Sequence, residues 1–138
     1  MNRHLLDAST LLLAVGAEHP LKNVCQQWLL AGEDQHVRLE ASVEVGQEYL
    51  FHRTRRVGAT QAAREFEALE ELVVWHPFDQ EILRRTATLV ATGTIGGRDA
   101  VHAATALAAG FTEIVSADRD FDRVPGLTRR APDDLPTA

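Results

Sequence analysis

Acidic residues stand just after short apolar segments at two distant places in the sequence. Asp7 directly follows the pair Leu5-Leu6, and Asp118 follows the segment 113–115 after a short polar turn. If both segments are strands of one parallel sheet, their carboxyl ends bring the two carboxylates to the same edge. Two carboxylates about 5 Å apart repel by about 3 kcal/mol at an effective dielectric constant of about 20. The pattern therefore predicts a divalent cation that offsets this repulsion.

Asp99 is a third candidate ligand, because it begins a helical segment after the turn-forming pair Gly96-Gly97. Each of these acids also has a purely structural explanation. An aspartate at a helix start accepts backbone N–H bonds, and aspartates clustered in a turn are common turn formers. Asp120, in the same turn as Asp118, is a weaker candidate for this site.

A fourth acid is expected from the segment that follows the second predicted strand. Glu40, Glu44 and Glu48 recur at four-residue intervals, which predicts that they lie along one side of a helix. A solvated acidic stripe explains two of them. Glu48 precedes Tyr49-Leu50-Phe51 in the middle of the helix, so we select it as the acid that points toward a pocket. An all-carboxylate ligand set favours Mg²⁺ or Mn²⁺.

The elements that position these acids alternate along the chain. Each predicted helix is a stretch in which apolar residues recur with helical spacing. Ser, Thr or Asp marks most of the starts, and glycine marks most of the ends. Helices are predicted at 10–15, 20–31, 43–57, 61–72, 80–92 and 98–109, and strands at 4–6, 36–39, 73–75, 113–115 and 127–129. This alternation predicts an α/β fold, a three-layer α/β/α sandwich with a mainly parallel central sheet of about five strands.

The bulk properties fit one globular domain. The 138 residues are 45% apolar, and we expect a single domain over 1–138 with a loosely held tail from about residue 132. The longest apolar run, 11–15, is far shorter than the ~20 residues that a membrane-spanning helix needs. Cys25 is the only cysteine, which favours a core position on a helix and a reducing cytoplasm.

The net charge of −6 argues at first against a nucleic-acid partner, because phosphate binding depends on cationic side chains. Bound cations would remove that objection. The basic residues are grouped, and Arg53, Arg55 and Arg56 are candidates for contact with RNA, although solvated helix faces explain such groups equally well.

Four segments, taken in order, resemble the PIN-domain nucleases and in particular the VapC-type toxins. The segments are 5–10, 42–50, 98–107 and 114–122, and the last, which ends in acids around Phe121, is the most distinctive. The resemblance implies that Asp7, Glu48, Asp99 and Asp118 form the family's acidic quartet. It places Ser9 at the small polar position near the first aspartate, and it adds Asp120 and Ser116 as further candidate site residues. Ala8 and Ser116 stand where threonine is frequent in the family, and both keep the position small.

The resemblance also implies a function. It predicts an endoribonuclease that uses Mg²⁺ or Mn²⁺ to cleave structured RNA, such as a tRNA or rRNA loop. It further implies a homodimer restrained by a small VapB-like antitoxin whose C-terminal segment crosses the acidic cleft. The apolar surface for that partner is expected on the third and fourth helices: Tyr49, Leu50, Phe51, Phe66 and Leu69.

Three other functions are considered. A PIN-like module without catalysis is the main alternative. A Mg²⁺-dependent phospho-acceptor domain also collects acids at strand ends, but the only lysine, Lys22, lies in the second helix and not after a late strand. A phosphatase with a nucleophilic aspartate is disfavoured, because Asp7 has no second acid two residues later. His102, one turn beyond Asp99, is a candidate to reach the substrate, but we favour a packed or exposed helix histidine.

Overall fold

The computed structural model describes residues 1–136. Strands β1 (Asn2–Leu5), β2 (Val37–Ser42) and β3 (Val73–His76) pair in parallel in the order β1-β2-β3, and β4 (Glu113–Val115) pairs in parallel with β5 (Thr128–Arg130). A parallel bridge between Leu6 and Val115 joins the two groups. The resulting strand order, β3-β2-β1-β4-β5, confirms the predicted parallel sheet of five strands.

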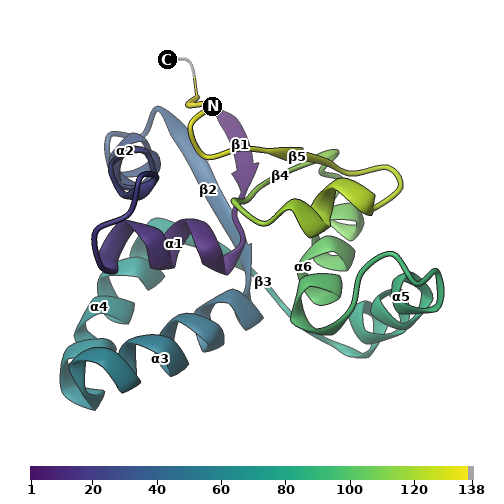
Figure 1. Cartoon of the computed structure of the whole chain (residues 1–138), viewed down its shortest axis with the longest axis horizontal. Helices are drawn as coiled ribbons and strands as arrows, with labels where there is room; N and C mark the ends of the chain where they lie inside the picture. The colour runs from purple at the N-terminus through teal and green to yellow at the C-terminus, as the bar shows by residue number, and fades with distance from the viewer. Residues whose placement is uncertain (137–138) are drawn as a thin grey trace.

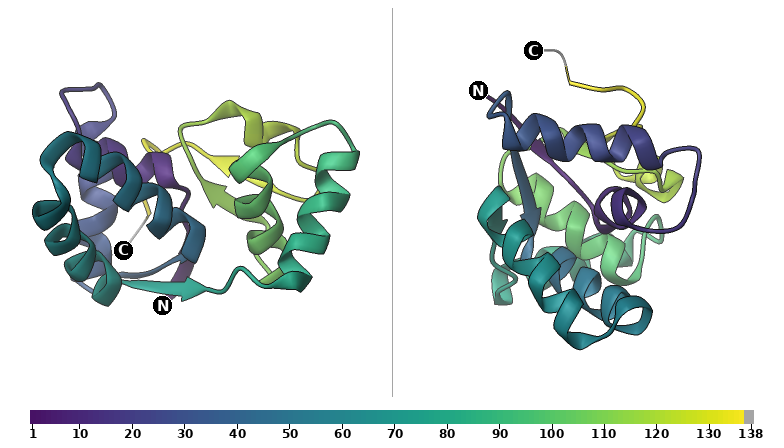
Figure 2. Two further views of the ribbon diagram at one scale, coloured as in Figure 1. Left: turned by 90° about the horizontal axis from the view of Figure 1, so that it is seen from below. Right: turned by 90° about the vertical axis from the view of Figure 1, so that its left-hand side faces the viewer.

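Helices cover both faces of this sheet (Figures 1 and 2). Helices α1 (Ala8–Val15), α2 (Lys22–Glu33), α3 (Val43–Val57) and α4 (Ala59–Leu72) lie on one side. Helices α5 (Gln80–Ala91) and α6 (Gly97–Ala108) lie on the other, together with a short 3₁₀ helix, η1 (Arg119–Arg123). The three-layer α/β/α prediction is therefore confirmed.

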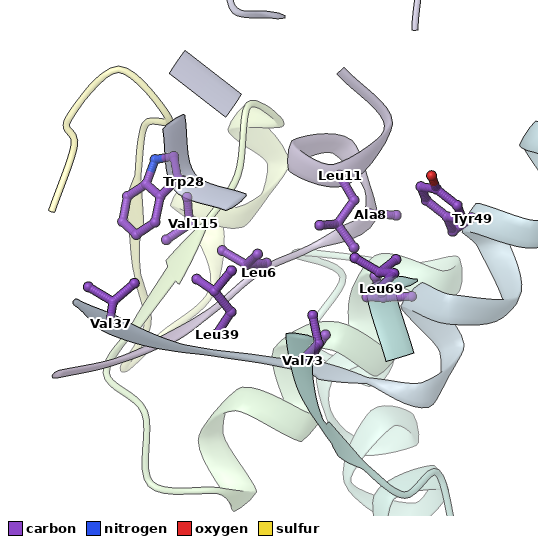
Figure 3. Close-up of a cluster of buried hydrophobic side chains, with 12 residues drawn as sticks. Leu6, Ala8, Leu11, Trp28, Val37, Leu39, Tyr49, Leu69, Val73 and Val115 are labelled. Carbon is purple, nitrogen blue, oxygen red and sulfur yellow. The ribbon is translucent and has the colours of Figure 1, made fainter. Parts of the chain in front are cut away.

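Neighbouring residues of β1 show how the sheet is buried on both faces. Leu6 belongs to the larger apolar cluster, which it shares with Trp28 of α2 and residues of α1, α3 and α4 (Figure 3). Leu5 belongs to a second cluster with alanines of α6 and with Phe121. Side chains alternate between the two faces of a strand, so consecutive leucines serve opposite layers. Cys25 is fully buried in α2, as expected.

Polar residues at strand ends start the helices that follow. Asp7 accepts a hydrogen bond from the Thr10 N–H and is the N-cap of α1, so this helix begins two residues before the predicted start. Ser42 caps α3 in the same way by accepting from the Glu44 N–H. Each helix thus begins directly at the carboxyl end of a strand, and the capping residues lie at that edge of the sheet.

Glu40 does not lie on a helix. It is a fully buried residue of β2, where Arg3, Arg38 and His76 surround its carboxylate at 2.6–3.1 Å. The prediction of a stripe formed by Glu40, Glu44 and Glu48 is therefore wrong for Glu40. Its four-residue spacing to Glu44 arises because the strand runs into the helix without a loop.

The C-terminal segment makes contacts with the rest of the chain as far as residue 135. The Trp28 Nε1–H donates to the Pro132 carbonyl at 2.8 Å, and the Arg130 guanidinium donates to the carbonyls of Asp134 and Leu135. Leu135 packs against the larger apolar cluster. The rest of the predicted loose tail, residues 137–138, lies outside the described residues. In residues 1–136, no helix is both long enough and apolar enough to cross a membrane.

Candidate metal centre

Asp7 is held at the carboxyl end of β1 by hydroxyl groups. Its Oδ1 accepts a hydrogen bond from the Ser9 hydroxyl at 2.7 Å, and its Oδ2 accepts one from the Ser116 hydroxyl at 2.7 Å. The side chain is almost fully buried, and Thr10 adds longer contacts. Both carboxylate oxygens are thus oriented by neighbours.

Ser116 connects Asp7 to the turn after β4. While its hydroxyl donates to Asp7, its Oγ accepts from the backbone N–H of Asp118 at 2.9 Å. The Ser9 Oγ accepts from the Ala117 N–H at 3.2 Å. The two serines that sequence reasoning placed near the acids therefore form the hydrogen-bonded link between the ends of two strands.

Three carboxylates converge beside this link. Asp99, Asp118 and Asp120 each offer one oxygen, and these oxygens lie within 4.8 Å of one another. Asp99 comes from the first turn of α6, where Gly97 has a left-handed φ of 59° that favours glycine. Asp120, a weaker candidate from the sequence, is a full member of this set. Asp7 and Glu48 lie outside it.

The carboxylates of this site repel one another. Burial and the negative charge of Asp118 raise the pKa of Asp99 from 3.8 to about 6, and Asp7 adds to the rise. Burial also raises the pKa of Asp7, although hydrogen bonds from Ser116 and Ser9 oppose it. The effect of Asp118 and Asp7 on the pKa of Asp99 places the three acids in one electrostatic environment.

Glu48 points toward α6. Its Oε1 lies 2.8 Å from His102 Nε2, and its side chain is 13% exposed. His102, for which packing or exposure was favoured over a reach toward the substrate, is 1% exposed and contacts this acid. Sequence reasoning missed this contact. The available signal was the one-turn spacing between Asp99 and His102, which places both on one side of α6.

The residues present fit a divalent cation. The donors are carboxylate oxygens, which suit hard cations such as Mg²⁺ and Mn²⁺. A positive ion among Asp99, Asp118 and Asp120 would offset the repulsion seen in the raised pKa of Asp99. Asp7 lies close enough to this position to raise the pKa of Asp99.

The three arginines predicted to contact RNA have different environments. Arg53 is buried, and its guanidinium donates to both carboxylate oxygens of Glu65 at 2.8 and 3.1 Å. Arg55 and Arg56 are exposed and line a cleft of about 450 Å³ between α3 and α1. The structure therefore leaves two of these three guanidinium groups accessible to a phosphate.

Two of the five apolar residues expected to contact a partner belong to the core instead. Tyr49 and Leu69 are buried in the larger apolar cluster, and Leu50 and Phe66 are partly buried. Phe51 is 43% exposed, and the Arg55 and Arg98 guanidinium groups lie 5.6 and 5.9 Å from its ring centre. Beside the acids, a groove of about 530 Å³ is lined by Ser9, Leu12, Leu13, His19, Leu21, Ala117 and Asp118.

Comparisons with known proteins agree with this arrangement. The PIN domain family matches residues 4–127. Ribonuclease VapC7 of Mycobacterium tuberculosis is 33% identical over 136 residues, covering 94% of this chain and 91% of that protein. Ribonuclease VapC13 of the same organism is 32% identical over 132 residues, covering 92% and 98%.

Solved structures show the same fold. The DNA-bound VapBC of Salmonella typhimurium superposes with a TM-score of 0.73 at 19% identity, covering 96% of this chain and 99% of that one. The sarcin-ricin loop cleaving toxin VapC20 of Mycobacterium tuberculosis gives 0.69 at 19% identity, covering 86% and 92%. The family match replaces the phospho-acceptor alternative. This chain belongs to the PIN-domain family.

Proposed function

We propose that this chain is a metal-dependent endoribonuclease, the toxin of a toxin–antitoxin pair that acts in the cytoplasm. The observation that carries the proposal is the convergence of Asp99, Asp118 and Asp120, whose oxygens lie within 4.8 Å of one another in a PIN-domain chain. The relatives named as VapC ribonucleases support the same activity. The intact set of acids favours an enzyme over an inactive interaction module.

The chain's own residues divide the work of phosphodiester hydrolysis. Asp99 and Asp118 are the primary ligands, Asp120 assists them, and Asp7 is fixed by Ser9 and Ser116 beside them. Mg²⁺ or Mn²⁺, when bound, supplies a Lewis acid that offsets the charge developing on phosphorus and makes a water easier to deprotonate. Glu48 or Asp99 orients the water for in-line attack. The products are a 5′-phosphate and a 3′-hydroxyl.

Exposed arginines near the acids supply the contacts with RNA. Arg55 and Arg56 line the cleft on α3, and Arg98 directly precedes the ligand Asp99. Guanidinium groups bind phosphate through paired hydrogen bonds, and their positive charge offsets the acidic surface of the chain. Because Arg53 is occupied by Glu65, we assign RNA contact to Arg55 and Arg56. The substrate class is a structured tRNA or rRNA loop.

The partner is a small VapB-like antitoxin, and the chain is a homodimer. The resemblance to VapBC complexes supports the partner. The groove beside Asp118 offers apolar walls for a peptide, and a cationic side chain of that peptide would pair with the acids. Co-expression with the neighbouring reading frame, followed by size-exclusion chromatography with light scattering, tests both statements. A monomer that binds no product of that frame would contradict them.

A crystal soaked in Mn²⁺ tests the metal site itself. Anomalous density bounded by Asp99, Asp118 and Asp120, with Asp7 and Glu48 as the further proposed ligands, is the expected result. Density elsewhere, or none at saturating Mn²⁺, would contradict the assignment of these residues as ligands.

A further inference from the structure

His102 is buried in α6, yet its one polar contact in residues 1–136 reaches the acidic site. Its Nε2 lies 2.8 Å from Glu48 Oε1, which belongs to α3, 54 residues away in the sequence. The ring is 1% exposed. The contact therefore joins a helix on one side of the sheet to a helix on the other side.

The buried imidazole of His102 has few polar neighbours. Within the described residues, the buried His102 Nδ1 has no hydrogen-bond partner. Four helix positions near the ring are alanines that offer no polar side-chain atom, Ala100, Ala103, Ala104 and Ala106, and the Thr105 hydroxyl donates to the Val101 carbonyl. Burying a polar ring is unfavourable unless its nitrogen atoms are paired. Within residues 1–136, Glu48 is the one hydrogen-bond partner of the ring, and it pairs Nε2 alone.

The position of His102 in α6 links it to the candidate metal ligands. Asp99 lies three residues before His102 on the same helix, so both side chains stand on one side of α6. Glu48 approaches this side from α3. One of its oxygens is held by the imidazole, which leaves the other available as a ligand.

We propose that His102 is a positioning residue that fixes the carboxylate of Glu48 toward the cation. This inference rests on the proposed function, because it requires a divalent ion at the acidic cluster. A glutamate side chain has several rotatable bonds, and a hydrogen bond to one oxygen restricts them. Partners that orient metal-ligating groups typically change metal affinity or activity by about 10–100-fold when they are removed.

Mn²⁺ binding to the purified full chain tests this role, with the dissociation constant measured by electron paramagnetic resonance. His102→Leu removes the donor and should weaken Mn²⁺ binding by about 10–100-fold. His102→Gln keeps an N–H at a similar reach and should restore most of the affinity. Combining His102→Leu with Glu48→Gln should weaken binding no further than Glu48→Gln alone, because both changes remove one interaction.

Thr105→Val is the matched control. Thr105 is also buried in α6, but its hydroxyl donates within the helix to the Val101 carbonyl. This variant should alter the unfolding temperature and leave the Mn²⁺ affinity unchanged. If His102→Leu behaves in the same way, His102 is only a packing residue and the proposal is overturned.

A second measurement tests the same role without the His102→Leu variant, in case that variant fails to fold. In the wild-type protein with Mg²⁺, ¹⁵N spectra of the His102 ring should show a proton on Nε2, and the ring signals should shift in Glu48→Gln but not in Glu44→Gln. Unchanged signals in Glu48→Gln would overturn the proposal. A wild-type protein that binds no Mn²⁺ would overturn the proposed function and this role together. If wild type binds Mn²⁺ and His102→Leu binds it with the same affinity, this role alone is overturned.

Discussion

The hydroxyl of Ser116 lies 2.7 Å from the carboxylate of Asp7, although the two residues are 109 positions apart in the sequence. This hydrogen bond spans the place where β1 and β4 meet through the Leu6–Val115 bridge. It fixes Asp7 and, through the Asp118 N–H, the start of the acidic turn. The site is therefore built across the least extensive strand pairing of the sheet.

Ser116→Ala should disconnect these two segments. We expect weaker Mn²⁺ binding and a loss of about 1–3 kcal/mol in the free energy of unfolding, because a buried acid loses a donor. Isothermal titration with Mn²⁺ and denaturant unfolding measure the two effects. Thr112→Ala, an exposed change just before β4, is the control. Equal Mn²⁺ affinity in Ser116→Ala and wild type would show that the link is dispensable.

Asp99→Asn should stabilise the metal-free protein. The pKa of Asp99 is raised from 3.8 to about 6, so the folded state favours its neutral form. Its stabilising contribution is full below about pH 4 and is lost as the pH rises through about 6. In EDTA at pH 7 to 8 the variant should be more stable than wild type by about 1–2 kcal/mol, a value reduced for the partial exposure of the group.

The pH dependence and the effect of metal distinguish this explanation from a general gain in stability. The difference between Asp99→Asn and wild type should grow between pH 4 and 6 and level off above that range. Saturating Mn²⁺ should stabilise wild type and reverse the order. Denaturant unfolding at several pH values checks this, and a difference that does not depend on pH would contradict the assigned repulsion.

Much of this site was predictable because parallel strands end at one edge of a sheet. Asp7 follows an apolar segment directly and Asp118 follows one after a short polar turn, so their approach depends on assigning the two strands correctly. Glu40 was misplaced because a four-residue interval fits a helix, while here it spans a strand and the helix that follows without a loop. The contact between His102 and Glu48 depends on how α3 and α6 pack, which no local pattern encodes.

Arg55 and Arg56 should affect RNA binding, and Arg53 should affect folding. Changing both Arg55 and Arg56 to Ala should weaken RNA binding and reduce the slope of log K against log salt by about 1 to 1.5, since each lost phosphate contact to a single strand contributes about 0.7. The free energy of unfolding should stay nearly unchanged. Fluorescence anisotropy over a range of salt concentrations measures the slope.

Arg53→Ala serves as the matched comparison. It removes the pair with Glu65, so it should lower the free energy of unfolding by about 2 kcal/mol. We assign RNA contact to Arg55 and Arg56 and a folding role to Arg53. An unchanged salt slope in Arg55→Ala/Arg56→Ala would contradict this assignment. So would an Arg53→Ala variant that is as stable as wild type but has a reduced salt slope.

Glu40→Gln should destabilise the fold in a pH-dependent way. Burial alone would raise the pKa of Glu40, but hydrogen bonds from Arg3 and His76 bring it below its ordinary value of 4.5. The stabilising contribution of this carboxylate is therefore present above about pH 4.5 and lost as the pH falls through the lower folded value. We expect a loss of about 2 kcal/mol at pH 7 that shrinks in acid. Thermal unfolding of both proteins from pH 3 to 7 measures it, and a constant difference would contradict this explanation.

Cleavage of a labelled structured RNA, with and without EDTA, tests the central claim most directly. Wild type should cleave in Mg²⁺ or Mn²⁺, lose activity in EDTA and recover it when the cation is restored, leaving 5′-phosphate and 3′-hydroxyl ends. Asp99→Asn, Asp118→Asn and Glu48→Gln, purified in parallel, should lose at least about 100-fold in rate, while Glu44→Gln should remain close to wild type. Undiminished cleavage in EDTA, or equal cleavage by Asp99→Asn, would contradict the assignment of this chain as a metal-dependent ribonuclease.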